Sequence, residues 1–135
     1  VFEKVDLHYP NKIAEISAQN KIKTLITVSA IGANANSANF YLQTKGKMEK
    51  SIFKKSIPNI YFLRPSMLLG KRKEFRLGEF IGKHLMNLLG FVFIGKLKQY
   101  KAIDAWKVAK CMVFLAKNKY PSPIVENRDI FQLIK

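Results

Sequence analysis

The sequence lacks several features that would assign it to a specialised class of protein. It has one cysteine, Cys111, so no internal disulfide can form and a reducing, cytoplasmic setting is the expectation. No apolar run reaches the roughly 18 residues that a membrane-spanning helix needs, since the longest, residues 85–94, is interrupted by Asn87 and Gly90. No stretch at the beginning resembles a secretory signal. A membrane association is therefore not expected.

Acidic residues are scarce relative to basic ones. Nine Asp and Glu oppose 24 Lys and Arg, which gives a formal net charge of +15 at pH 7. Such a balance is typical of proteins that bind nucleic acid or an anionic surface. However, only four of the cations are arginines, the residue that nucleic-acid readers favour for its bidentate geometry, and the lysines are spread along the chain. We interpret the charge mainly as a solvated lysine-rich surface, with a polyanion-binding module or an acidic partner as lesser alternatives.

Metal chemistry has equally little support in the sequence. His8 and His84 are the only histidines, and neither has further metal-ligating residues at a useful spacing. No metal site is expected. Cys111 falls within a helical apolar pattern and is expected to be a core residue.

What the sequence does have is an alternation of strand-like and helix-like segments. Short β-branched or aromatic runs predict strands, and helical spacing predicts helices, the first of them with Pro10 in its first turn. The expected strands are 24–29, 60–64 and 124–126; the later helices are about 38–54, 104–118 and 127–133. For the helix that Asp104 should cap, the residues expected to face inward are Trp106, Ala109, Met112, Val113 and Ala116.

This alternation predicts an α/β fold with a parallel sheet, but one that begins in its middle. Three strands are few for an open sheet, which usually has about five or six, and no glycine-rich phosphate loop follows a strand. We therefore interpret residues 1–135 as a single partial domain, the second half of a Rossmann-like doubly wound sheet whose N-terminal glycine-loop half is missing. The exposed edge at 24–29 would then attract a protein partner or a second copy of the chain.

Three stretches in order carry a family resemblance. They are Val28–Gly32 followed by Tyr41–Lys45, then Leu63–Gly70, then Ile103–Ala109. Together they resemble the atypical and extended short-chain dehydrogenase/reductase family, and residues 37–46 and 72–79 are most similar to its Tat-interacting oxidoreductase-like subgroup. The resemblance covers nearly the whole chain, aligned to the second half of those proteins. Two positions depart from the family pattern, Ala30 and Lys107.

The resemblance implies an NAD(P)-dependent oxidoreductase, expected to be inactive as this fragment alone. Tyr41 and Lys45 lie four residues apart, so on a helix they share one face, and an ammonium beside a phenol lowers the phenol's pKa toward the working range. The resemblance implies that Tyr41 transfers the proton, that Lys45 holds the nicotinamide ribose, and that Ser29 orients a small-molecule substrate. Because Ala30 replaces a second serine, the identity of the orienting hydroxyl stays open.

The resemblance also assigns a cofactor segment and leaves alternatives. NADP or NAD would be held by Tyr41 and Lys45 and by the loop that comprises Pro65, Ser66, Met67 and Leu68, with a substrate-side segment at about 70–103. One alternative function is a non-enzymatic member of the same fold that senses NADP(H) and binds a protein partner. Structural alternatives also stay open: Tyr41–Lys45 as an ordinary helix pair, Ser29 as the end of a strand, and Arg64–Pro65 as a strand-ending device.

Overall fold

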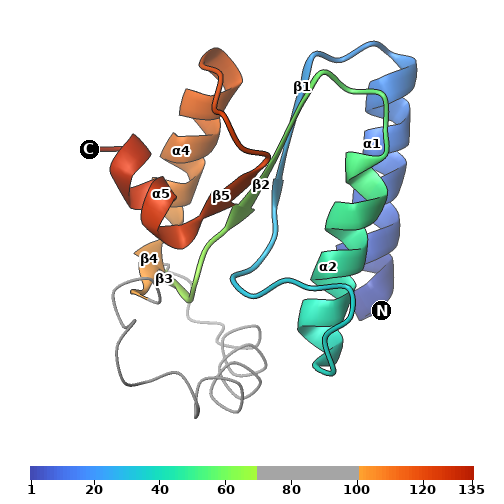
Figure 1. Cartoon of the computed structure of the whole chain (residues 1–135), viewed down its shortest axis with the longest axis horizontal. Helices are drawn as coiled ribbons and strands as arrows, with labels where there is room; N and C mark the ends of the chain where they lie inside the picture. The colour runs from blue at the N-terminus through green and yellow to red at the C-terminus, as the bar shows by residue number, and fades with distance from the viewer. Residues whose placement is uncertain (70–100) are drawn as a thin grey trace.

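The computed structural model of the chain describes residues 1–69 and 101–135 (Figure 1). Most of the predicted substrate-side segment, including the apolar stretch 85–94, lies outside the described residues.

The centre of the fold is a parallel sheet of three strands in the order β1-β2-β5. These strands are β1 (Thr24–Val28), β2 (Asn59–Arg64) and β5 (Ile124–Glu126). β1 runs in register with β2 along its whole length, and β5 pairs with the carboxyl half of β2. The predicted α/β class with a parallel sheet is confirmed and is consistent with a Rossmann-like fold. The finer prediction, that a glycine-loop half is missing, has no support in the structure.

The central strand shows why this sequence forms a parallel sheet. The residues from Ile60 to Leu63 are all buried, so β2 is apolar on both of its faces. Parallel strands are usually covered by helices on both sides, and continuous apolar runs are typical of them. A second, smaller sheet pairs β3 (Leu68–Leu69) with β4 (Ile103–Asp104), also in parallel.

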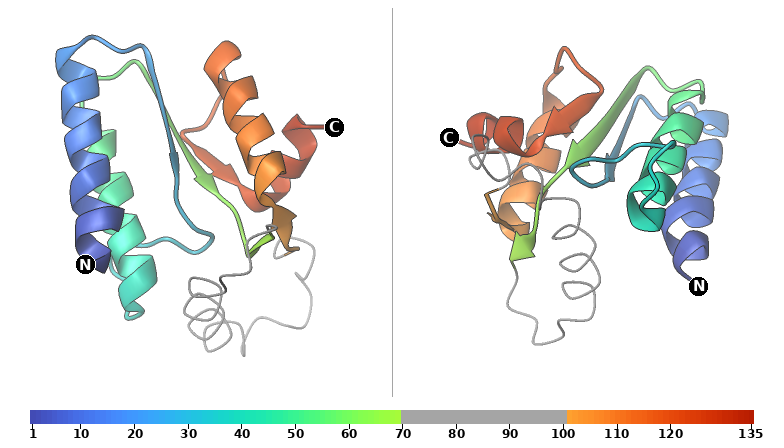
Figure 2. Two further views of the ribbon diagram at one scale, coloured as in Figure 1. Left: turned by 180° about the vertical axis from the view of Figure 1, so that it is seen from behind. Right: turned by 60° about the horizontal axis from the view of Figure 1, so that its bottom comes forward.

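Helices cover both faces of the main sheet. On one side lie the π-helical turn η1 (Lys4–His8), which leads into α1 (Tyr9–Gln19), and α2 (Phe40–Phe53). On the other side lie α4 (Ala105–Lys117) and α5 (Asn127–Leu133). The views in Figures 1 and 2 agree that α1 and α2 are neighbours on one face and α4 and α5 on the opposite face. Among the described residues, no helix has the length and apolar character needed to cross a membrane.

The two helical layers give two separate apolar cores. Phe62 points toward α1 and α2 and packs with residues such as Ala14 and Met48. Its neighbour Leu63 points the other way and packs with residues of α4 that include Cys111. This alternation follows from the two-residue period of a strand. The prediction that Cys111 is a core residue is confirmed, because its side chain is fully buried, and burial raises the pKa of its thiol to about 11.

Local signals set the ends of the helices. Pro10 lies in the first turn of α1, as predicted. The side chain of Asn39 accepts a hydrogen bond from the backbone N–H of Leu42 and so caps α2. Glu126 and Asp129 form a reciprocal capping box at the beginning of α5. Asp104 occupies the N-cap position of α4 as expected, although its side chain makes no capping hydrogen bond.

The predicted inward face of α4 is wrong for four of its five residues; only Met112 is partly buried and packs against the core. Trp106 and Val113 are 60% and 57% exposed, whereas the buried residues are Val108, Cys111 and Leu115. Both sets are apolar and both have helical spacing, so the periodicity alone could not choose between them. Packing on the sheet covers the side that carries Val108, Cys111 and Leu115. The exposed Trp106 ring is instead approached by the ammonium groups of neighbouring lysines.

Candidate functional site

The candidate site lies where β1 and β2 end. The backbone N–H of Ser29 donates to the carbonyl of Leu63 (2.7 Å), and that of Ile31 donates to the carbonyl of Pro65 (3.1 Å). The two loops that follow the strands are thus joined. In open α/β sheets, ligands bind outside the carboxyl ends of the strands, so these two loops form the candidate site.

The loop after β1 turns back onto helix α2 because of two glycines. Gly32 has a φ of 80°, a left-handed conformation that favours glycine. Gly46 allows close approach, since a Cβ atom there would lie 2.1 Å from the backbone nitrogen of Ala35. The backbone N–H of Asn34 also donates to the carbonyl of Leu42 (3.1 Å). The loop therefore packs directly on the first turns of α2.

This packing brings Tyr41 and Lys45 next to the end of β1. The Nζ atom of Lys45 lies 6.0 Å from the centre of the Tyr41 ring, so the two residues share one face of α2 as their spacing predicts. Ala30, the residue after Ser29, packs in one apolar cluster with Tyr41 and Leu42. The structure thus places Tyr41 and Lys45 close to the chain that carries Ser29. Their chemical roles stay predictions.

Two residues that pack against this site, Asp6 and Phe2, were not predicted from the sequence. The Nζ atom of Lys45 lies 2.6 Å from Oδ1 of Asp6, and both side chains are largely buried. The ring of Phe2 lies 5.6 Å from that of Tyr41 and 5.7 Å from that of Phe40, between centroids. These contacts join segments far apart in the sequence. No local sequence pattern indicates these contacts.

The predicted effect of Lys45 on Tyr41 is wrong. The pKa of Tyr41 is raised to about 12, first because burial penalises the phenolate and second because the Asp6 carboxylate is near. The sequence analysis expected the opposite direction from the Lys45 ammonium alone. In the folded protein, Asp6 compensates the charge of that ammonium. At neutral pH Tyr41 is therefore a neutral phenol.

The buried hydroxyl group of Ser29 makes no hydrogen bond among the described residues. Its residue is 3% exposed, and within the part of the chain that the structure describes its hydroxyl has no hydrogen-bond partner. Most buried hydroxyls are hydrogen-bonded, and leaving one unpaired costs about 1–3 kcal/mol. A serine that only ended a strand would carry this cost without a compensating contact.

The segment predicted to lie beside a nicotinamide is mostly engaged by the protein itself. The backbone N–H of Ser66 donates to Oδ1 of Asn127 (3.0 Å), and its hydroxyl donates to the carbonyl of Lys101. The carbonyl of Met67 accepts from the backbone N–H of Ile103. Met67 and Leu68 are nonetheless about half exposed. Of this segment, only the side chains of Met67 and Leu68 are open to a ligand.

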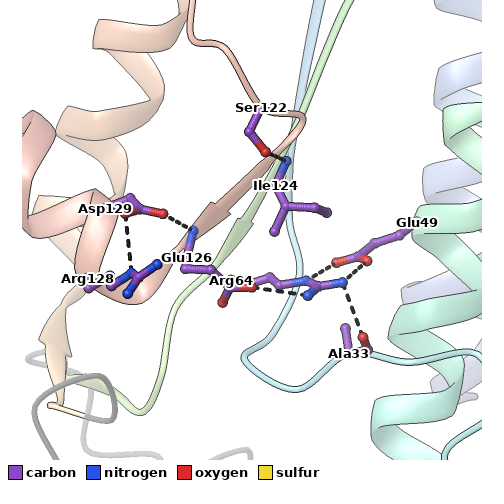
Figure 3. Close-up of polar contacts among 8 residues, drawn as sticks. All are labelled: Ala33, Glu49, Arg64, Ser122, Ile124, Glu126, Arg128 and Asp129. Atoms are coloured by element: carbon purple, nitrogen blue, oxygen red, sulfur yellow. Dashed lines mark hydrogen bonds and ion pairs between the residues drawn. The ribbon is translucent and has the colours of Figure 1, made fainter. Parts of the chain in front are cut away.

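A second polar cluster, around Arg64, includes Glu49, which lies one helical turn after Lys45 on α2 (Figure 3). The guanidinium donates to both carboxylate oxygens of Glu49 (2.9 and 2.6 Å), to Glu126 (3.2 Å) and to the carbonyl of Ala33 (3.2 Å). The Glu49 carboxylate is the main cause that raises the pKa of Arg64. The cluster thus ties β2, β5, α2 and the loop after β1 together, and it gives Arg64 more than the strand-ending role considered from the sequence.

One hollow among the described residues lies beside this second cluster. It has a volume of about 400 Å³, and its walls include Phe53, Phe62 and Ile124 in addition to Glu49 and Arg64. Neither Tyr41 nor Lys45 lines it. The hollow and the predicted site are therefore separate places, and its walls carry none of the residues that the sequence analysis singled out for chemistry.

Comparison with known proteins gives a consistent set of relatives. No family model matches the chain. The protein named FMP52, mitochondrial, from Candida albicans is 37% identical over 110 residues, which are 80% of this chain and 48% of the relative. The protein of the same name from Debaryomyces hansenii is 33% identical over 85% of this chain and 50% of its own length. FMP52-1, mitochondrial, from Scheffersomyces stipitis is 39% identical over 72% of this chain and 38% of its own. The chain spans about half the length of the curated relatives it matches.

These relatives correct three predictions made from the sequence. The assignment to the short-chain dehydrogenase/reductase family is wrong on this comparison, because the similar proteins are named FMP52 and no family model supports it. The predicted function, an NAD(P)-dependent oxidoreductase, fails on the same finding, and neither alternative gains support. The cytoplasmic setting is also wrong, because the relatives are named as mitochondrial proteins. The chain is similar to a group of mitochondrial fungal proteins whose names state no activity.

Proposed function

We propose that this chain contributes a binding site for a nicotinamide dinucleotide, NADP or NAD, to a mitochondrial protein. The proposal concerns binding and includes no hydride transfer. The observation that carries it is the buried Ser29 hydroxyl, which has no partner among the described residues and lies at the carboxyl end of β1. The mitochondrial setting rests on the names of the relatives.

The chemistry of the site suits the sugar end of such a ligand. Ser29 and Tyr41 offer hydroxyl groups that can donate and accept, and Lys45 offers an ammonium that donates. Parallel α/β sheets bind dinucleotides at this edge, with the pyrophosphate at a glycine-rich turn. No glycine-rich turn of this kind follows a strand in the sequence. The 135 residues by themselves should then bind weakly, with a Kd of roughly 1 mM, because they hold only one end of the ligand.

Binding is tested by titrating the 135-residue chain with NADH and NADPH and following its ¹H–¹⁵N NMR signals. We expect the amide signals of residues 29–31 and 41–46 to shift. In Ser29→Ala and Lys45→Met the Kd should rise about fivefold or more, since each variant loses a hydrogen bond to the ligand. Lys47→Met is the matched control, because Lys47 lies on the same helix, is exposed, and donates a hydrogen bond to the Gln43 side chain. An absence of shifts in the unmodified chain, or an equal loss in the Lys47 control, would refute the proposal.

The mitochondrial setting has an independent test. Cells that express the whole protein at its native level can be fractionated, and the protein followed with an antibody raised against the 135 residues. We expect it in the mitochondrial fraction. Recovery of most of it in the cytosol would contradict this part of the proposal and leave the binding site untouched.

A further inference from the structure

Helix α4 is apolar on two of its sides, and the sheet covers only one of them. The uncovered side carries Trp106, Ala109, Val113 and Ala116, all of which are exposed. They follow one another at intervals of three, four and three residues. Such alternating intervals keep side chains on one stripe of a helix, and a stripe of this kind is the seam along which two helices pack. We call these four residues the outer seam of α4.

The side chains of the outer seam suit a helix better than a lipid surface. Helices that lie on a membrane bury a broad face of bulky apolar side chains. In the outer seam, the larger Trp106 and Val113 alternate with two alanines. Small residues between larger ones let a second helix approach closely and let its side chains fit into the gaps.

The charged residues of α4 are all lysines. Lys110 and Lys117 each follow a seam alanine directly, so they flank the outer seam on one side. The Nζ atoms of Lys107 and Lys110 lie 5.7 and 6.0 Å from the centre of the Trp106 ring. Within residues 1–69 and 101–135, no carboxylate forms an ion pair with any of these lysines. The seam is therefore bordered by positive charge that the described residues do not compensate.

We propose that the outer seam of α4 is a docking surface for an amphipathic helix of another protein, one that carries acidic residues beside its own apolar seam. The apolar side chains supply the contact area, and the lysines select the partner by its charge. A second copy of α4 fits less well, because it would bring more lysines and no acid to the contact. α4 lies on the opposite face of the sheet from α2, which carries Tyr41 and Lys45, so docking there is independent of the proposed function (Figure 1).

Trp106 is the only tryptophan in the sequence, so its fluorescence reports directly on the outer seam. The probe is a synthetic amphipathic peptide of about three heptads, with leucines in its seam and glutamates beside them. A second peptide has lysines in place of the glutamates. With the 135-residue chain, we expect the glutamate peptide to shift the Trp106 emission to shorter wavelength until it saturates, and the lysine peptide to leave the emission unchanged.

Reversing the charge beside the seam should reverse this preference. In Lys110→Glu/Lys117→Glu we expect the affinity for the glutamate peptide to fall about tenfold, because two attractive pairs become repulsive, and the lysine peptide to bind. Lys47→Glu/Lys50→Glu is the matched control, since it makes the same change of charge at exposed positions of α2. This control should bind the glutamate peptide as the unmodified chain does. All four replaced lysines are exposed, so both variants should fold, which circular dichroism checks.

Four results would overturn the proposal. One is the absence of an emission shift when the glutamate peptide is added to the unmodified chain. Another is an equal loss of affinity in the α2 control, because the peptide would then respond only to the net charge of the chain. An emission shift on concentrating the chain alone would identify a second copy as the occupant. A shift with vesicles that contain anionic phospholipid, together with no response to the glutamate peptide, would identify a lipid surface.

Discussion

Helix α2 carries two ion-pair clusters that differ in how completely their hydrogen bonds are satisfied. Arg64 donates to Glu49, Glu126 and Ala33 and so uses four of its five N–H groups within the protein. Lys45 makes one ion pair, with Asp6, beside a phenol whose pKa is raised. Ser29, which precedes Ala30 of the Tyr41 apolar cluster, has a buried hydroxyl with no partner among the described residues.

The difference separates a structural cluster from a candidate binding site. A fully satisfied polar network gives a fold rigidity and leaves nothing for a ligand to bond. A partly satisfied one is costly unless something else completes it, so its presence in a folded protein points to function. By this criterion the Arg64 cluster holds the elements together, and the Lys45 cluster is the place where we propose that a ligand binds.

The largest expected effect is on the free energy of unfolding when each of the two cations is replaced in turn. Arg64→Met should lower the free energy of unfolding by about 3–5 kcal/mol, because it leaves Glu49 buried without its partner. Lys45→Met should cost less, about 1–2 kcal/mol, since only one pair is lost. Urea denaturation followed by circular dichroism measures both. The comparison breaks down if Lys45→Met is the more destabilising variant.

A smaller effect is expected where the loop after β1 meets α2. Gly46→Ala would place a methyl group 2.1 Å from the backbone of Ala35, and backbone cannot move aside as a flexible side chain can. We expect a loss of about 2 kcal/mol in unfolding free energy. The matched change Lys47→Ala, at the next and exposed position of the same helix, should be nearly neutral. Equal stabilities for these two variants would show that the loop does not pack on α2 as described.

The smallest expected effect concerns the phenol of Tyr41. Because its pKa is raised from 10 to about 12 in the folded protein, folding favours the protonated form. The resulting stabilisation is complete below pH 10 and is lost as the pH rises from 10 toward 12. The unmodified chain should therefore lose about 1 kcal/mol more than Tyr41→Phe between pH 9 and pH 11. An identical pH dependence for the two proteins would mean that Tyr41 is neither buried nor close to Asp6.

The strands of the main sheet and the helices α1, α2, α4 and α5 could be predicted because their signals are local, whereas the short strands β3 and β4 and the turn η1 were not predicted. The β-branched run at 24–28, the apolar run at 60–63 and the capped helix after Asn39 each lie within one short stretch of sequence. The alternation of these elements was enough to predict a parallel α/β sheet. The inward face of α4 could not be predicted, since apolar residues lie on two of its sides and only the sheet decides which of them is covered.

In the candidate site, too, some features could be predicted from the sequence and others could not. The shared face of Tyr41 and Lys45 follows from a spacing of four residues on a helix. The direction of the Tyr41 pKa does not, because it depends on burial and on Asp6, which lies 35 positions before Tyr41 in the chain. Likewise nothing local to Arg64 indicates that its guanidinium meets Glu49 and Glu126.

The sequence alone determined where this chain forms the strands of its main sheet and the helices that cover it, that these strands run parallel, and that Tyr41 and Lys45 lie together. Only the tertiary structure decided that Lys45 is neutralised, that Tyr41 stays a neutral phenol and that Ser29 is buried without a partner. The physical reason is the distance along the chain over which each effect acts. Backbone propensity and periodicity act over a few residues, whereas burial and charge pairing depend on which distant segments the fold brings into contact.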